Sequence, residues 1–366
     1  MESGAEGRED VADTRERAGG NMTDAGAAGR RRSGGDRLTP GLALRLTVAF
    51  FLPPRFTPRS VRYDRRYRKL DQYRFIVWFL SLPVLVYGVF VVSPFLQAFF
   101  YSMTDWTGYS ASYEFTGFEN YERMWNDDKF WEATRNSLLL LVVAPVVTLV
   151  MGLFFAYMLT AGGRRRNEAV AGVTGSGVYK IVYFFPQVLS LAIIAVIWAR
   201  IYSPRSGALN AGLDAVGLDS WQREDWLGSS WAIWCVLVVL CWSFVGFYVV
   251  LFSAAMSAIP TEIYEAARLD GAGRSVTFFR ITFPLTWETV RTGWIYMGIQ
   301  ALDAFALVNV MVPEHGMDVL PSYLFEKSFR DGQAGYATTI GVALFVITLL
   351  FATVMLRIGR RDRIEL

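Results

Sequence analysis

Long apolar segments alternate with polar segments along most of this chain, from about residue 75 to residue 356. A helix needs about 20 mostly apolar residues to cross the hydrocarbon core of a bilayer. Backbone polar groups in lipid must be satisfied within the segment, so helices are the expected structure. The candidate segments are Phe75–Phe100, Leu138–Leu159, Ile181–Tyr202 with Pro186 near its start, Trp231–Ala255, Val290–Val312 and Thr338–Leu356. The pattern predicts an all-α polytopic membrane protein with about six transmembrane helices.

The N-terminal part of the chain lacks this pattern. Residues 1–40 are rich in Gly, Ala, Arg, Asp and Glu and have few apolar side chains to bury, so we expect a disordered tail. Residues 41–73 form a basic juxtamembrane segment, in which Gly41–Leu52 is too short to span a bilayer and suits an interfacial helix. Residues 74–366 form the predicted transmembrane domain.

Composition agrees with a membrane protein. Only 19% of the 366 residues are charged, against roughly 25% in an ordinary soluble domain. Cys235 and Cys241 lie six residues apart in one apolar segment, so on a helix they point in different directions. We interpret both as packing residues that form no disulfide.

The distribution of arginines orients the spans. Basic residues concentrate in the tail, in the loops around Arg164–Arg166 and Arg268–Arg280, and at the end of the chain from Arg357. The remaining loops, 105–132, 214–225 and 314–331, carry most of the acidic residues between spans. The positive-inside rule then places both termini in the cytoplasm, in a multi-pass protein of the plasma membrane. The tail also contains three consecutive arginines at positions 30 to 32. We interpret them as residues that keep the tail in the cytoplasm, and not as a nucleic-acid-binding site.

A polar hairpin lies between the fourth and fifth apolar segments, on the predicted cytoplasmic side. It contains Glu265, Ala266, Ala267, Asp270 and Gly271. The alanines would let another protein approach closely, and Glu265 would give the contact a direction. Gly271 suits the left-handed conformation that ends many helices.

This hairpin resembles the EAA loop of the membrane subunits of binding-protein-dependent ABC importers. That family pattern has Glu-Ala-Ala, three residues, Gly, nine residues and then Ile-x-Leu-Pro. The six positions that agree here are Glu265, Ala266, Ala267, Gly271, Ile281 and Pro284, with Phe283 in place of the usual Leu. The resemblance implies that the hairpin is a cytosolic helix that couples the permease to an ATPase.

Further stretches are similar to the carbohydrate-type members of that family, from about Arg74 to the C-terminus. They include Ser102–Trp106 after the first span, Gly117–Tyr121 before the second and Phe184–Pro186 in the third. The segment Val312–Gly316 departs from the Gly-Gly-Pro found in many members. The stretches Gly163–Arg166, Tyr179–Gln187 and Phe329–Ala334 are most similar to actinobacterial permeases for N-acetylglucosamine and its β-linked dimer.

The resemblance also implies partners. These are two copies of an ABC ATPase subunit, a second homologous permease subunit, an extracellular solute-binding lipoprotein that delivers the sugar, and the lipid bilayer. A nucleotide-binding P-loop needs Gly directly before its Lys, and none of the four lysines of the chain follows a glycine. We therefore expect ATP hydrolysis on separate subunits, and no cofactor or catalytic residue in this chain.

Five polar or aromatic residues within the spans are candidates for the substrate path: Trp242, Tyr248, Gln300, Asp303 and Asn309. Aromatic rings can stack on sugars, and polar side chains in spans usually face protein or a cavity. Packing between helices is the alternative for all five, and it is favoured. Glu288 and Arg291 are expected to form a local ion pair.

Two other functional classes receive less support. A proton-driven carrier would hold ionisable groups in mid-span, where Asp303 is the single acidic candidate. A membrane enzyme would need a catalytic or metal-binding cluster, and the one histidine, His315, is expected to be an ordinary loop residue.

Overall fold

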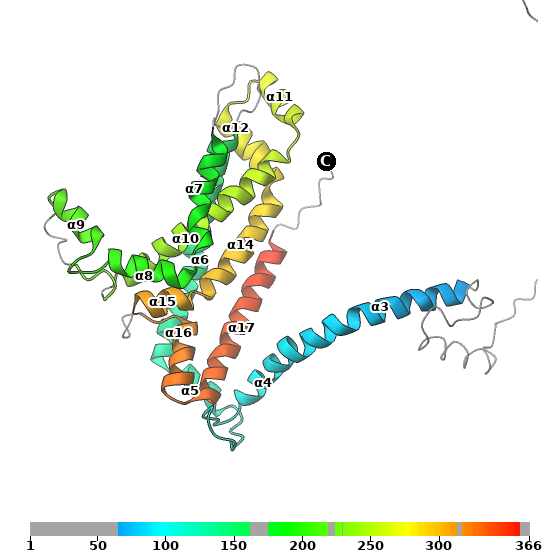
Figure 1. Cartoon of the computed structure of the whole chain (residues 1–366), viewed down its shortest axis with the longest axis vertical. Helices are drawn as coiled ribbons and strands as arrows, with labels where there is room; N and C mark the ends of the chain where they lie inside the picture. The colour runs from blue at the N-terminus through cyan, green and yellow to red at the C-terminus, as the bar shows by residue number, and fades with distance from the viewer. Residues whose placement is uncertain (1–64, 162–174, 219–223, 229, 313–316, 359–366) are drawn as a thin grey trace, which may run out of the picture. The chain divides into compact units, whose positions relative to one another are not determined.

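The computed structural model of the chain describes residues 65–161, 175–218, 224–228, 230–312 and 317–358. Their backbone is mainly helical, and the β-bridge between Thr104 and Phe115 is isolated. The helices are α3 (Arg65–Tyr87), η2 (Gly88–Val92), α4 (Ser93–Tyr101), α5 (Glu119–Trp125), α6 (Asp128–Ala161), α7 (Ser176–Val188), α8 (Leu191–Ile201), α9 (Ala208–Ala215), α10 (Ala232–Ser257), α11 (Thr261–Leu269), α12 (Arg274–Thr277), η4 (Phe278–Thr282), α13 (Phe283–Leu285), α14 (Trp287–Leu302), α15 (Phe305–Met311), α16 (Leu320–Phe325), η5 (Glu326–Arg330) and α17 (Ala334–Arg357) (Figure 1).

The all-α polytopic prediction is confirmed. Among the described residues, the helical segments long and apolar enough to cross a membrane are Phe75–Tyr101, Asp128–Thr160, Ala232–Ser257, Trp287–Met311 and Ala334–Arg357. A bent pair, Gly177–Val188 and Leu191–Ile201, gives a sixth if it counts as one span. The predicted tail, most of the basic segment, the Arg164–Arg166 loop and His315 lie outside the described residues.

The chain divides into two units, residues 1–84 and 85–366. The described part of the first unit is the beginning of α3. In the second unit α4 packs on α17, where Phe95 and Phe99 contact the ring of Phe345 at centroid distances of 5.4 and 5.9 Å.

Two proline residues explain two of the π-helical turns. Pro94 follows η2 and Pro284 follows η4, each two residues after the turn ends. A proline ring clashes with the carbonyl four residues earlier and cannot donate to it. Those carbonyls belong to Phe90 and Arg280, which lie inside the two wider turns. The π turn thus accommodates each proline without ending the helical path.

The predicted third span, Ile181–Tyr202, is broken into two helices. Helices α7 and α8 meet at 95°, and Leu189 and Ser190 between them have extended backbones. Pro186 removes one backbone donor from the last turn of α7. Both sides of the break are apolar, so the hydropathy pattern continues across it.

The fifth span is also interrupted. Asp303 and Ala304 separate α14 from α15. Helix α8 follows the break in the third span, and helix α15 follows the break in the fifth. These two helices pack against each other (Figure 1).

The core of the second unit lies where α6, α10 and α14 pack together. Tyr248 is fully buried there, and Gly152 of α6 lies so close that a Cβ would be 2.6 Å from the Cβ of Tyr248. A glycine at this position lets the two helix backbones approach closely. Cys235 and Cys241 are buried and unpaired, which confirms their prediction as packing residues.

Hydrogen bonds join α5, α6, α16 and α17 at the end of the bundle opposite α11 (Figure 1). The Asp127 Oδ2 atom accepts hydrogen bonds of 2.5 Å from the hydroxyls of Tyr323 and Tyr336. Arg123 donates to Gln333 at 2.8 Å and lies over the Tyr336 ring. We call Asp127, Tyr323, Tyr336, Arg123 and Gln333 the polar cluster.

Candidate functional site

The hairpin predicted from the sequence forms a short helix and a return limb at one end of the bundle (Figure 1). Helix α11 begins after Pro260, whose extended backbone leads into the first turn. Glu262 lies in that turn, where its negative charge favours the helix dipole. The return limb consists of α12, η4 and α13.

The end of α11 confirms the left-handed conformation predicted for Gly271. Its φ is +77°, and its amide donates to the Arg268 carbonyl at 3.1 Å. The next amide, that of Ala272, donates to the Ala267 carbonyl at 2.9 Å. These two bonds make a Schellman motif, which satisfies carbonyls at the helix end and fixes the direction of the return limb.

Helix α11 has one buried face and one exposed face. Tyr264 and Ala267, three residues apart, are buried against the chain itself. Glu265 and Ala266 are exposed, and so are Asp270 and Gly271 after them. Ala267 therefore serves the packing of α11 on its own chain, which corrects the interpretation that both alanines face a partner. Of the alanine pair, Ala266 is the one on the exposed face.

Three apolar side chains on the hairpin are exposed, Val276 on α12 and two more strongly exposed ones, and the sequence reasoning missed all three. Leu269 is 89% exposed at the end of α11, and Phe279 is 68% exposed in η4. A helical projection would have found Leu269. It follows Ala267 by two residues, which is a rotation of about 200° around a helix, so Leu269 lies on the face opposite the buried Ala267. Exposed large apolar groups beside charged ones are typical of sites that contact another protein.

The substrate-path candidates occupy different environments. Trp242 is 40% exposed on α10, and its ring meets that of Trp198 edge-on at 5.5 Å. Tyr248 is fully buried, and its hydroxyl donates to the Gly293 carbonyl at 2.9 Å. The packing alternative therefore fits Tyr248.

The other three candidates lie on both sides of the break in the fifth span. Gln300 is half-buried on α14, Asp303 is exposed at the break and Asn309 is exposed on α15. Asp303 caps α14, since its amide donates to the Ile299 carbonyl at 3.0 Å. Of the three, Asp303 and Asn309 therefore lie on the surface of the single chain.

The ion pair predicted in the same helix is confirmed. Arg291 Nη2 lies 2.6 Å from Glu288 Oε2, one turn apart near the start of α14. The pair links two neighbouring side chains of one helix.

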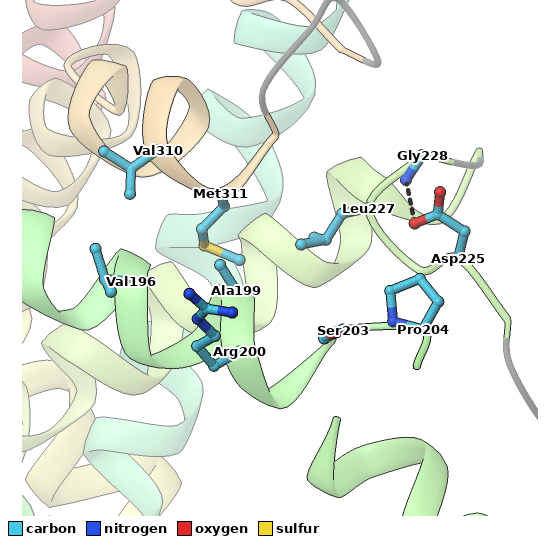
Figure 2. A pocket seen from close by; sticks show the side chains of 10 residues that line it. All are labelled: Val196, Ala199, Arg200, Ser203, Pro204, Asp225, Leu227, Gly228, Val310 and Met311. Carbon is cyan, nitrogen blue, oxygen red and sulfur yellow. Dashed lines mark hydrogen bonds between the residues drawn. The ribbon is translucent and has the colours of Figure 1, made fainter. Parts of the chain in front are cut away.

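A pocket of about 490 Å³ lies between α8, α15 and residues 225–228. Arg200 and Asp225 are its charged residues, and Figure 2 shows the Asp225 carboxylate turned to the Gly228 amide, 3.0 Å away. None of the substrate-path candidates lines it. Within the described part of the chain, no group of His, Cys, Asp and Glu side chains is arranged to hold a metal ion.

Solved structures share this fold. A bacterial alginate ABC transporter, solved with an alginate pentasaccharide-bound periplasmic protein, contains a chain that matches with a TM-score of 0.67 at 20% identity. The match covers 81% of this chain and 98% of that one.

Sequence relatives are more informative. The diacetylchitobiose uptake system permease protein NgcF of Streptomyces coelicolor is 42% identical over 84% of this chain and 88% of its own length. The xylose/arabinose import permease protein XacH of Haloferax volcanii is 30% identical over 74% of this chain and 83% of its own length.

The family model for binding-protein-dependent transport system inner membrane components matches residues 149–363. That region includes the whole hairpin and the spans on both sides of it. The chain thus belongs to this family, as a multi-pass, non-catalytic permease subunit of an ABC transporter in the plasma membrane.

Proposed function

We propose that this chain is the permease subunit of an ATP-driven importer of N-acetylglucosamine oligosaccharides, with the β-linked dimer as the first candidate substrate. The observation that carries this proposal is the 42% identity to a diacetylchitobiose uptake permease over 84% of the chain. The similarity to a permease for xylose and arabinose supports the broader class of sugars.

The hairpin would lie in the cytoplasm, together with both chain termini. The clusters of arginine in the predicted inside loops support this orientation. The polar cluster around Asp127 and the loop after α8 would then face the outside, where an extracellular binding lipoprotein would deliver the sugar.

ATP hydrolysis would take place on two copies of a separate ATPase subunit. No lysine of this chain follows a glycine, so it has no P-loop. The exposed face of α11 would bind the ATPase, with Leu269 as an apolar anchor and Glu265 as the charge that orients the contact. A buried apolar anchor surrounded by polar contacts is the usual energetic centre of a protein interface.

A second, homologous permease subunit would complete the substrate path. Trp242, Asp303 and Asn309 are exposed on the single chain although they belong to spans. Polar side chains inside a membrane usually face other protein or a water-filled cavity. The path would therefore run between the two subunits, along the faces of α10, α14 and α15 that carry these residues.

The test measures uptake of radiolabelled diacetylchitobiose in a strain that lacks the chromosomal copy of this permease, complemented by wild type or variants. ATPase co-purification is measured on the same complexes. We expect Leu269→Asp and Glu265→Arg each to lower assembly tenfold or more, since contacts of about 1–3 kcal/mol are lost.

The matched control is Phe118→Ser, which removes an exposed apolar side chain at the opposite end of the bundle. It should assemble like wild type. Wild-type assembly in both hairpin variants would refute the docking face, and absence of uptake in the complemented wild type would refute the proposed substrate.

A further inference from the structure

The buried face of α11 is attached to the rest of the chain by a side-chain hydrogen bond. The hydroxyl of Tyr264 lies 3.2 Å from Thr282 Oγ1, and both residues are buried. Burial raises the pKa of the Tyr264 phenol above its ordinary value, so the hydroxyl stays neutral and available for this bond. Thr282 is the last residue of η4.

Thr282 is itself linked to the start of the fifth span. The Thr286 hydroxyl donates to the Thr282 carbonyl at 2.8 Å, and Thr286 immediately precedes α14. Tyr264, Thr282 and Thr286 therefore form a continuous hydrogen-bonded path from α11 to α14. All three side chains are buried, where such bonds are screened from water.

A second tyrosine attaches the return limb to the second span. Tyr157, near the end of α6, donates from its hydroxyl to the Arg274 carbonyl at 2.9 Å. Its ring also meets that of Phe278 at a centroid distance of 4.8 Å. The return limb is thus attached to α6 at its beginning and to α11 at its end.

These attachments lead to the centre of the core. Helix α6 packs along α10 and α14, so the Tyr157 bond starts from this packed group and the Tyr264 path reaches it through Thr286. The exposed residues Glu265 and Leu269 lie on a different face of α11 from Tyr264. Docking and attachment are therefore separate properties of this helix.

We propose that Tyr264 and Tyr157 are positioning residues whose hydroxyl bonds make the hairpin move together with α6 and α14. This inference rests on the proposed function of α11 as the site that binds the ATPase. Without the bonds, α11 can shift against η4, and movement of a bound ATPase is only partly passed to the spans.

The experiment uses the full importer, purified with its ATPase and reconstituted in proteoliposomes with its binding protein. Sugar imported per ATP hydrolysed is measured for Tyr264→Phe, Tyr157→Phe and the double variant. Each change removes one hydroxyl and keeps the ring. We expect a fall of about fivefold in each single variant, the effect of one net hydrogen bond on an equilibrium, with ATPase co-purification unchanged.

The matched control is Tyr121→Phe. It removes a hydroxyl bonded to Ser102 Oγ at 2.8 Å, the same kind of bond at the other end of the bundle. It should leave import per ATP unchanged. A Tyr264→Phe/Thr282→Val variant removes both hydroxyls of the pair and also the 3.5 Å bond from Thr282 Oγ1 to the Thr277 carbonyl, so it should lower import per ATP at least as much as Tyr264→Phe.

The outcomes separate this inference from the proposed function. Unchanged import per ATP in Tyr264→Phe and in the Tyr264→Phe/Tyr157→Phe variant would overturn the inference. Loss of the ATPase from these two variants, with the ATPase retained in wild type and in Tyr121→Phe, would overturn it too. A fall of the same size in Tyr121→Phe would also count against it, since the effect would then be general loosening. Failure of wild type to bind the ATPase would overturn the proposed function, and this inference with it.

Discussion

Gly271 ends α11 in a conformation that few other residues adopt. A Cβ at this position would meet nothing within 4 Å, so the requirement comes from its φ of +77° and not from crowding. The path of the chain from α11 into the return limb thus depends on this residue.

We expect Gly271→Val to destabilise the hairpin by about 1–2 kcal/mol, since a left-handed backbone strains a residue with a Cβ. ATPase co-purification should fall, while insertion of the spans is unaffected. Gly273→Ala is the control, because Gly273 has a φ of −73° and equally open surroundings. Equal co-purification of the two variants would contradict a role for the glycine turn.

Asp303 tests the rival class of proton-driven carriers. It is exposed at the break between α14 and α15. In an ATP-driven importer, uptake by wild type and by Asp303→Asn should both persist when the proton gradient is collapsed and ATP is held constant. Uptake by wild type that stops with the gradient under these conditions would favour a secondary carrier.

At the scale of elements, the sequence predicted the long spans well and their interruptions poorly. Helices α6, α10 and α17 each contain about 20 apolar residues, which is the quantity that a hydropathy pattern detects. Helix α6 begins ten residues earlier than predicted, at Asp128, because its first turns are polar. The break at Leu189–Ser190 lies inside an apolar run, so no pattern marks it.

For the hairpin, too, the sequence predicted some features and not others. Spacing and residue type were enough to predict the helix and its glycine end. The face of α11 that is buried depends on what packs against it, and the bond from Tyr264 to Thr282 shows that the return limb covers this face. The burial of Ala267 could therefore be found only in the structure, and the exposure of Leu269 follows from it by the geometry of the helix.

The polar cluster gives a prediction about pH. Burial by itself raises the pKa of Asp127, but hydrogen bonds from Tyr323 and Tyr336 and from two backbone amides outweigh it and lower the pKa below 3.8. A carboxylate with a depressed pKa stabilises the folded state above its unfolded pKa, and that contribution is lost as the pH falls through the folded pKa.

We therefore expect Asp127→Asn to lower the thermal stability at pH 7, and the difference from wild type to shrink below about pH 4. The measurement is thermal unfolding in nanodiscs across this range. Asp128→Asn is the control, since Asp128 is an exposed neighbour in the sequence. A difference that does not depend on pH would show that the Asp127 charge is unimportant for the cluster.

For the whole molecule, the orientation in the membrane can be tested with thiol reagents. Both native cysteines are buried, so they should give little background labelling. In intact cells an impermeant reagent should label Asp219→Cys and fail to label Ser275→Cys, which is exposed on the hairpin limb. Permeabilised cells should show labelling of both, and the reverse pattern in intact cells would overturn the proposed topology.

The 95° bend of the third span has a mechanical consequence. A straight helix acts as a rod, which carries a push along its axis from one side of the membrane to the other. Helix α7 packs on α10, whereas α8 packs mainly on α15, and two extended residues join them. We therefore expect a push along α7 to reach α8 almost at a right angle and to be passed on to α15, so the pair cannot carry it as a single straight helix would.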